Sequence, residues 1–237
     1  MTLHRTLTTS KHRTVEITSD KPTIINHFDN SANYADVVLD MFNTDRFYDQ
    51  MFNGWDDLVI LDIGANIGLF SLYIQDRAKV IYALEPTPSH YEILQDLTKN
   101  YSNIKPLQIA LNDVDGPVEF YISDENSTMN STVNHYGKKI SVNGLTLPSL
   151  LNHLALDKVD FIKCDIEGSE MKALNDDIIS AVKDRVKVWS IEVHATDSYP
   201  SHEINLNQNR DKLAEMLNKQ GYRTYKHRYD GLYAYKV

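Results

Sequence analysis

Ionisable side chains gather around one glycine turn in the stretch KCDIEGSE, residues 163–170. Lys163 and Asp165 lie two residues apart in its extended part, so their side chains point to the same face of a strand. Glu167 and Glu170 follow, and their directions depend on the turn. Such a cluster directly after an apolar strand favours proton transfer or cation binding. Glu170 has an equally good alternative, which is to cap the next helix through its first amide groups.

The stretch IEVH adds Glu192 and His194, again two residues apart and therefore on one face of a strand. A histidine that faces acids across neighbouring strand ends can act as a general base toward a hydroxyl group. A pair of carboxylates could instead hold a divalent metal that lowers the pKa of that hydroxyl. The spacing does not separate these alternatives, because it matches no defined metal-binding loop. We predict a site without a metal, in which Asp165, Glu167 and His194 are the catalytic residues.

A glycine-containing loop, DIGANIG, follows another apolar run. Gly64 permits a tight turn and the close approach of a ligand to the backbone, and Gly68 lets the next helix pack down against the strand. A dinucleotide fingerprint would also require glycine at the positions of Asn66 and Leu69, and a phosphate loop ending in Gly-Lys-Ser/Thr is missing. A ligand without a pyrophosphate is therefore favoured. Asp62 supports a ligand without phosphate, because a carboxylate that enters the loop repels phosphate and attracts a cation.

Glu85 ends the next apolar strand, VIYALEP. An acid at a strand end about 20 residues after such a loop commonly binds both hydroxyls of a ribose. A ligand with a ribose, a positive charge and no pyrophosphate points to S-adenosylmethionine. The sequence therefore predicts a pocket with the loop amides and Asp62 at the amino acid end of this cofactor and Glu85 at its ribose.

Five segments, in order, resemble the FkbM-type methyltransferases, a branch of the Rossmann-like enzymes that use S-adenosylmethionine. They are DIGANIGLFSL, ALEPTPSHYEIL, ALNDVDG, DFIKCDIEGSE and IEVH, and the similarity covers about residues 57–194. The resemblance implies cofactor contacts in three groups: Asp62, Gly64, Asn66 and Gly68 with the methionine part, Glu85 with the ribose, and Ala110, Leu111 and Asn112, together with Asp113, with the adenine edge. The segments on either side are less alike, and substrate selection is assigned to them.

The resemblance also implies an activity, which is the methylation of a hydroxyl on a sugar, glycan or related small metabolite. Methyl transfer from a sulfonium is an in-line displacement, so holding the acceptor atom against the methyl group supplies most of the acceleration. Two other functions stay open. One is a module that binds the cofactor without catalysis. The other is a nicotinamide-dependent oxidoreductase, which the missing fingerprint glycines disfavour.

Strands must alternate with helices to position these residues. The apolar strand patterns are DLVILDIG, KVIYALEP, IKPLQIAL, KVDFIKCDI and RVKVWSIEVH, and SEMKALNDDIISAV between the last two reads as one helix. Strands that are apolar on both faces predict a parallel sheet with helices on both sides. The turn at Asp230-Gly231 makes the last strand antiparallel. We expect an α/β, Rossmann-like, doubly wound and mostly parallel seven-stranded sheet.

The domain boundary is placed at residue 55. Residues 1–55 are expected to be an N-terminal arm and helical decoration, and residues 56–237 the Rossmann-like domain. The chain before about Asn30 reads as an arm or a first hairpin, and the stretch from Tyr34 to Phe52 as one or two amphipathic helices. The polar stretch from Ser123 to Lys139 is either a surface connector or a lid over the acceptor.

Composition limits the partners. The chain has 24 Lys and Arg against 33 Asp and Glu, a formal charge of −9, and no dense basic run. This disfavours nucleic acid and favours a small-molecule or carbohydrate acceptor. The single cysteine, Cys164, lies in an apolar strand and is expected to be a buried filler. No secretory signal and no run near the ~20 apolar residues of a membrane span is present, so we expect no membrane partner and a cytoplasmic location.

Overall fold

The computed structural model describes residues 2–29, 35–44, 48, 51–122, 132, 137–196 and 202–236. The main sheet is built from β3 (Leu58–Ile63), β4 (Ala78–Leu84), β5 (Ile104–Leu107), β9 (Val159–Cys164), β10 (Val186–Glu192), β11 (Tyr222–His227) and β12 (Gly231–Lys236). Its order is β11-β12-β10-β9-β3-β4-β5, and only the pairs that involve β12 are antiparallel. The predicted seven-stranded sheet with an antiparallel last strand is confirmed.

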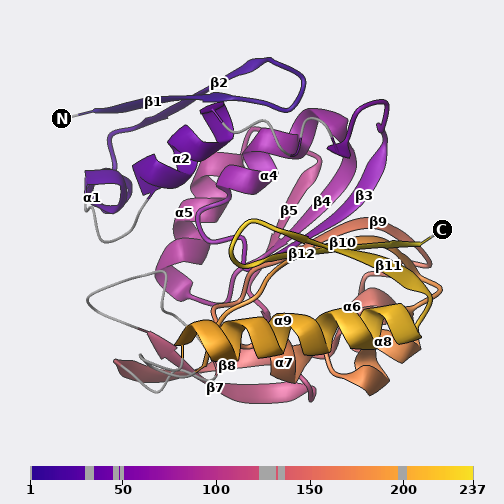
Figure 1. Cartoon of the computed structure of the whole chain (residues 1–237). Coiled ribbons are helices and arrows are strands. Elements are labelled where there is room, and N and C mark those ends of the chain that lie inside the picture. The colour runs from indigo at the N-terminus through magenta and orange to yellow at the C-terminus, as the bar shows by residue number, and fades with distance from the viewer. Residues whose placement is uncertain are drawn as a thin grey trace.

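Helices cover both faces of this sheet (Figure 1). One face packs against α2 (Ala35–Thr44), α4 (Leu69–Ile74) and α5 (Pro88–Thr98), and the other against α6 (Leu147–His153), α8 (Asp176–Val182) and α9 (His202–Lys219). Each face has its own apolar cluster, because strands buried on both sides offer side chains alternately to either layer. Pro88 starts α5 at a position where a missing N–H costs nothing.

The strand order reverses at β3. This strand pairs in parallel with β4, the next strand along the chain, and on its other side with β9, which comes much later. Ile60, for example, lies opposite Ile81 on one side and Phe161 on the other. In open parallel sheets the crevice outside the carboxyl ends of the strands at such a reversal is where ligands bind.

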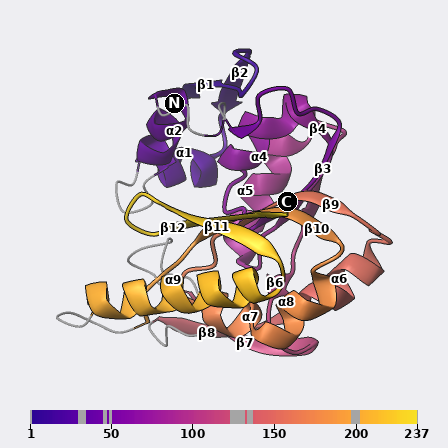
Figure 2. The ribbon, with the colours of Figure 1, turned by 45° about the vertical axis from the view of Figure 1, so that its right-hand side comes forward.

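The N-terminal segment packs onto the sheet domain. It forms a hairpin of β1 (Leu3–Thr8) and β2 (Thr14–Ser19), one of the two predicted alternatives, followed by α1 (Pro22–Asp29) and α2. Figures 1 and 2 both place the hairpin beside α2 and α4. Leu7 and Phe42 belong to the same apolar cluster as Ile60 of β3. The segment therefore shares a core with the sheet.

Two expected elements are split in the structure. IKPLQIAL divides into β5 and β6 (Ala110–Leu111), and β6 joins a separate three-stranded sheet with β7 (Gly116–Ile122) and β8 (Lys138–Leu145). Ile109 donates a backbone hydrogen bond to Leu107 two residues earlier, and this tight turn ends the strand. SEMKALNDDIISAV divides into α7 (Glu170–Ala173) and α8, because the Asn175 side chain accepts from the N–H of Ile178 and starts a second helix.

Cys164 is fully buried, as predicted. Within the described parts of the chain, no helix is long and apolar enough to cross a membrane. The cytoplasmic location stays a prediction.

Candidate active site

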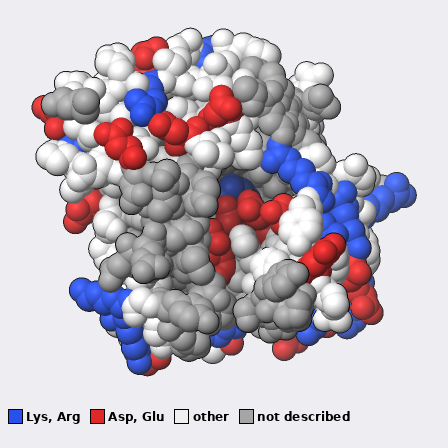
Figure 3. Space-filling model, turned by 60° about the vertical axis from the view of Figure 1, so that its left-hand side comes forward, with Lys and Arg blue, Asp and Glu red and all other residues white. Residues whose placement is uncertain are grey.

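A cavity of about 710 Å³ lies at the carboxyl ends of β3, β4, β9 and β10. Figure 3 shows a face of the molecule with a hollow in which Asp and Glu side chains gather. Eight of the predicted site residues line the cavity: Gly64, Asn66, Glu85, Ala110, Leu111, Asp165, Glu167 and His194. The structure thus brings the predicted catalytic cluster and most of the predicted cofactor residues into one space.

Three predicted cofactor residues, Asp62, Gly68 and Asn112, lie outside the cavity lining. Asp62 is the penultimate residue of β3 rather than part of the loop, and its fully buried carboxylate accepts a hydrogen bond from the Ser71 hydroxyl at 2.6 Å. Burial raises the pKa of Asp62 against the opposing charge of Lys163. Asp62 therefore supports the start of α4 from within the core instead of entering the loop.

Glu85 connects the end of β4 to the loop that follows β3. Its carboxylate accepts from the backbone N–H of Asn66 at 2.9 Å and of Thr87 at 2.8 Å, and burial raises its pKa. The side-chain oxygen of Asn66 is buried and has no hydrogen-bond donor among the described residues. An unsatisfied oxygen and a carboxylate on one cavity wall fit the hydroxyl and ammonium groups of S-adenosylmethionine.

The two loop glycines make room for other parts of the chain. Gly64 has φ +77°, and a Cβ there would lie 1.7 Å from the backbone oxygen of Asp165. The close approach predicted for a ligand is therefore made by the chain that follows β9. A Cβ on Gly68, at φ +90°, would lie 2.5 Å from Leu94 of α5. Gly68 thus lets α5, rather than the strand, pack against the loop.

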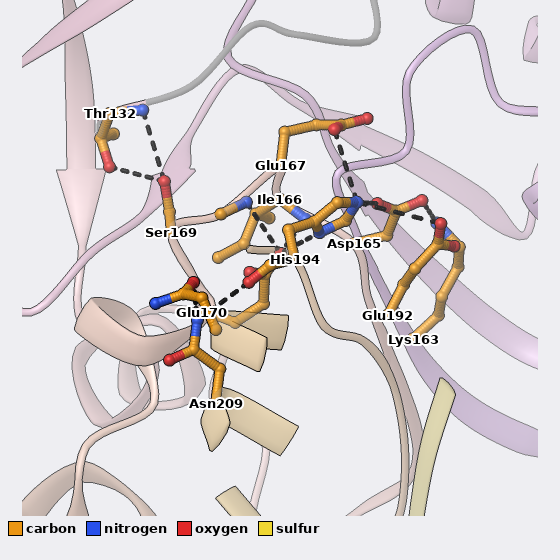
Figure 4. A network of polar contacts seen from close by, with 12 residues as sticks. Thr132, Lys163, Asp165, Ile166, Glu167, Ser169, Glu170, Glu192, His194 and Asn209 are labelled. Carbon is orange, nitrogen blue, oxygen red and sulfur yellow. Dashed lines mark hydrogen bonds and ion pairs between the residues drawn. The ribbon is translucent and has the colours of Figure 1, made fainter. Parts of the chain in front are cut away.

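His194 lies at the centre of an acid cluster (Figure 4). Its Nε2 atom is 3.4 Å from Glu167 Oε2, 3.9 Å from Asp165 Oδ1 and 3.9 Å from Glu192 Oε1. Lys163 Nζ lies 3.0 Å from the other oxygen of Asp165, Oδ2. The predictions that Lys163 and Asp165 share one face, and that Glu192 and His194 share one face, are confirmed.

Glu170 contacts His194 at Nδ1, the ring nitrogen that does not face Asp165 and Glu167. Its buried Oε1 atom lies 2.9 Å from His194 Nδ1 and accepts from the backbone N–H of Ile166 at 3.1 Å and of Gly168 at 3.3 Å. These amides belong to the turn before α7, so Glu170 does not cap the helix that it starts. Asn209 of α9 adds a hydrogen bond to the backbone oxygen of His194 at 3.0 Å. Glu170 thereby fixes the imidazole ring, and Asn209 fixes the backbone that carries it.

The cluster carries more carboxylates than cations. Burial lowers the pKa of His194, but Glu170, Asp165 and Glu167 more than offset it and raise the value to about 11. Burial raises the pKa of Asp165, and Lys163 and His194 reverse this, so its pKa is lowered. Burial and then the charge of Asp165 raise the pKa of Glu167 to about 8. The charge of Asp165 and then burial do the same for Glu192.

The cavity is completed by residues that the sequence did not identify. His27 and Phe42 come from the N-terminal helices, His90 from α5, and Arg228 and Tyr229 from the turn between β11 and β12. His27, Phe42, Arg228 and Tyr229 belong to the segments unlike the family, whereas His90 lies within the family-like segment ALEPTPSHYEIL. Most of the polar stretch 123–139 lies outside the described residues. Thr132 within it lines the cavity, and its hydroxyl lies 2.7 Å from that of Ser169.

The reversal of strand order, the glycine loop and Glu85 define a Rossmann-like methyltransferase that uses S-adenosylmethionine. The methyltransferase FkbM domain matches residues 62–224. Since this is more than half of the chain, the chain belongs to the FkbM methyltransferase family.

Two related proteins are also methyltransferases by name. Methyltransferase sdnD of Sordaria araneosa is 30% identical over an alignment of 177 residues, and the match covers 59% of this chain and 68% of that protein. Methyltransferase 1 of Beauveria bassiana is 29% identical over 50% of this chain, and the match spans 58% of its own length. Among solved structures, the fibrillarin pre-rRNA processing protein of Methanococcus jannaschii has a TM-score of 0.50 at 16% identity, covering 77% of this chain and 67% of that one. The structural likeness shows the fold.

Proposed function

We propose that the chain methylates a hydroxyl group on a sugar, glycan or related small metabolite. The observation that carries this proposal is that Asp165, Glu167 and His194 lie in the same cavity as the cofactor loop. A hydroxyl is a poor nucleophile at neutral pH and needs a group that takes its proton. Carboxylates also accept the hydrogen bonds that hydroxyl groups donate.

Glu85, the loop amides and the Asn66 side chain would hold the cofactor. When bound, S-adenosylmethionine supplies a methyl group on a positively charged sulfur, and it leaves as neutral S-adenosylhomocysteine once the methyl group has moved to the acceptor oxygen. The chain itself must orient the acceptor oxygen and receive its proton. The cluster around His194 has a defined geometry for both tasks, since Glu170 fixes the imidazole and Asn209 fixes the backbone of the same residue.

The acceptor is expected to be a small molecule or a carbohydrate rather than nucleic acid. Acidic side chains, among them Asp165, Glu167 and Glu192, line the cavity, and the chain carries a formal charge of −9. A phosphate backbone would therefore be repelled. Phe42 and Tyr229 add aromatic surface at the same cavity, and aromatic rings pack against the apolar faces of such acceptors.

The proposal is tested with methyl-labelled S-adenosylmethionine and a panel of sugars, glycosides, other alcohols and amines. We expect label on an acceptor oxygen, lost in Asp165→Asn and His194→Gln and kept in the control Glu119→Gln, which removes an exposed carboxylate on β7. Label on nitrogen would refute hydroxyl methylation. Binding of S-adenosylhomocysteine without transfer to any acceptor would favour the silent cofactor-binding module.

A further inference from the structure

We propose that Asp165, Glu167 and His194 bind a divalent cation of the Mg²⁺ or Mn²⁺ type at the acceptor end of the cavity. This replaces the prediction of a metal-free site made from the sequence. As a binding site the proposal stands by itself. As part of catalysis it rests on the hydroxyl methylation proposed above.

The donor atoms are already close to a ligand set. One ligand atom from each of the three side chains lies within 4.8 Å of the other two. Nε2 of His194 is 3.4 Å from Glu167 Oε2 and 3.9 Å from Asp165 Oδ1. Ligand atoms at ~2.1 Å from an ion and at right angles to each other lie about 3 Å apart. Small side-chain rotations therefore bring the three atoms onto one ion.

The imidazole is oriented as in a metal site. Glu170 Oε1 lies 2.9 Å from His194 Nδ1, so this nitrogen carries the proton that is shared with the carboxylate. The other nitrogen, Nε2, then faces the acids, and a cation that binds there displaces the proton through which Nε2 pairs with Asp165 and Glu167. Histidines that bind metals almost always donate their second ring N–H to a carboxylate, a carbonyl or water, which fixes the ring and raises its basicity.

Two carboxylate oxygens in the cluster lack a hydrogen-bond donor. Asp165 Oδ1 and Glu170 Oε2 are buried and accept no hydrogen bond from the described residues, and the whole Glu170 side chain is fully buried. The other oxygen of Asp165 is bound by Lys163, so Oδ1 is left facing His194 Nε2. A buried polar atom without a hydrogen-bond partner is costly. A divalent cation beside Asp165 Oδ1 removes that cost.

The excess of carboxylates over cations around His194 also favours a bound cation. Asp165, Glu167, Glu170 and Glu192 surround His194, and Lys163 pairs with Asp165. Two carboxylates and one imidazole suit Mg²⁺ or Mn²⁺, which prefer oxygen ligands. Three protein ligands leave positions open toward the cavity, where the cation would lower the pKa of an acceptor hydroxyl.

The test uses the full chain, treated with a chelator and desalted, and Mn²⁺ alone as the probe. Calorimetry and the loss of the free Mn²⁺ electron paramagnetic resonance signal should show one saturable site per chain. Asp165→Asn and Glu167→Gln should each weaken it at least about tenfold, and Glu170→Gln by about 10- to 100-fold. Glu119→Gln should bind as the unaltered chain does. Circular dichroism checks that each variant is folded.

Absence of saturable Mn²⁺ binding in the folded chain would overturn the proposal, as would unchanged binding in both Asp165→Asn and Glu167→Gln. Two further assays separate this failure from that of the proposed function. Methyl transfer that continues in chelator, with no Mn²⁺ site, leaves hydroxyl methylation standing and removes the metal. A Mn²⁺ site that depends on Asp165, together with no methyl transfer to any hydroxyl, keeps the metal and removes the proposed activity.

Discussion

Two buried histidines, His27 and His90, should make the folded chain lose stability in mild acid. Their rings meet edge to face with centroids 5.2 Å apart, and their exposed fractions are 6% and 5%. Burial lowers the pKa of each from 6.5 to about 4, with a smaller contribution to His27 from the neighbouring His90. The unfolded chain therefore binds protons first as the pH falls, so acid favours unfolding from about pH 6.5 down to about pH 4.

The magnitude follows from these values. At about pH 5 each histidine reduces the free energy of unfolding by about 2 kcal/mol, and the pair by about 4 kcal/mol. Buried carboxylates act in the opposite direction. Glu85 Oε1 lies 3.9 Å from His90 Nδ1, and its raised pKa means that the folded chain gains stability as this acid takes up its proton. The prediction therefore concerns the difference between the unaltered chain and a variant that lacks both histidines.

Urea denaturation at about pH 7 and about pH 5 measures this difference. Between these two values the unaltered chain should lose about 4 kcal/mol more than the double variant His27→Gln/His90→Gln. A single exposed histidine changed in the same way, His153→Gln, should keep the full loss. A difference below about 1 kcal/mol would refute the reasoning, because the two rings would then be free to bind protons in the folded chain.

Two further variants, each with a matched control, test the loop that is proposed to hold the cofactor. Glu85→Gln should weaken S-adenosylhomocysteine binding by about 1–3 kcal/mol in calorimetry, because a partner of the ribose is lost, whereas Glu92→Gln, an exposed change on α5, should bind normally. Equal affinities would remove Glu85 from the pocket. Gly64→Ala should cost more than about 3 kcal/mol of unfolding free energy, since its Cβ would meet a backbone oxygen at 1.7 Å. Gly54→Ala is the matched control, with φ +78° and nothing within 4 Å of the Cβ, and should cost only about 1–2 kcal/mol. Similar losses in both glycine variants would show that backbone strain, and not the close approach of the Asp165 backbone, requires glycine at position 64.

The sequence predicted what depends on local pattern. Runs apolar on both faces identified the parallel strands, and spacing by two placed Glu192 and His194 on one face. It predicted less where a turn decides direction. The split of α7 from α8 depends on the Asn175 side chain, and the role of Glu170 depends on amides that the turn presents to it.

Contacts between distant segments were beyond local pattern. Asp62 was expected in the loop, but β3 extends one residue past it and keeps its side chain in the core. His27 reaches the cavity only because α1 packs against α5, where its ring meets that of His90. No spacing in the sequence expresses either relation. The assignments of cofactor and catalytic residues remain predictions for the variants above.

The pairing of β3 with β9 also governs when the pocket forms during synthesis. A chain leaving the ribosome presents β3, the glycine loop and β4 long before β9 exists, and Gly64 takes its place against the backbone of Asp165 only after that segment has emerged. The loop is then completed by a partner that is made 101 residues later (165 − 64). We therefore expect that S-adenosylmethionine does not stabilise nascent chains that end before β9, in which β3 lacks the strand that pairs with one of its edges.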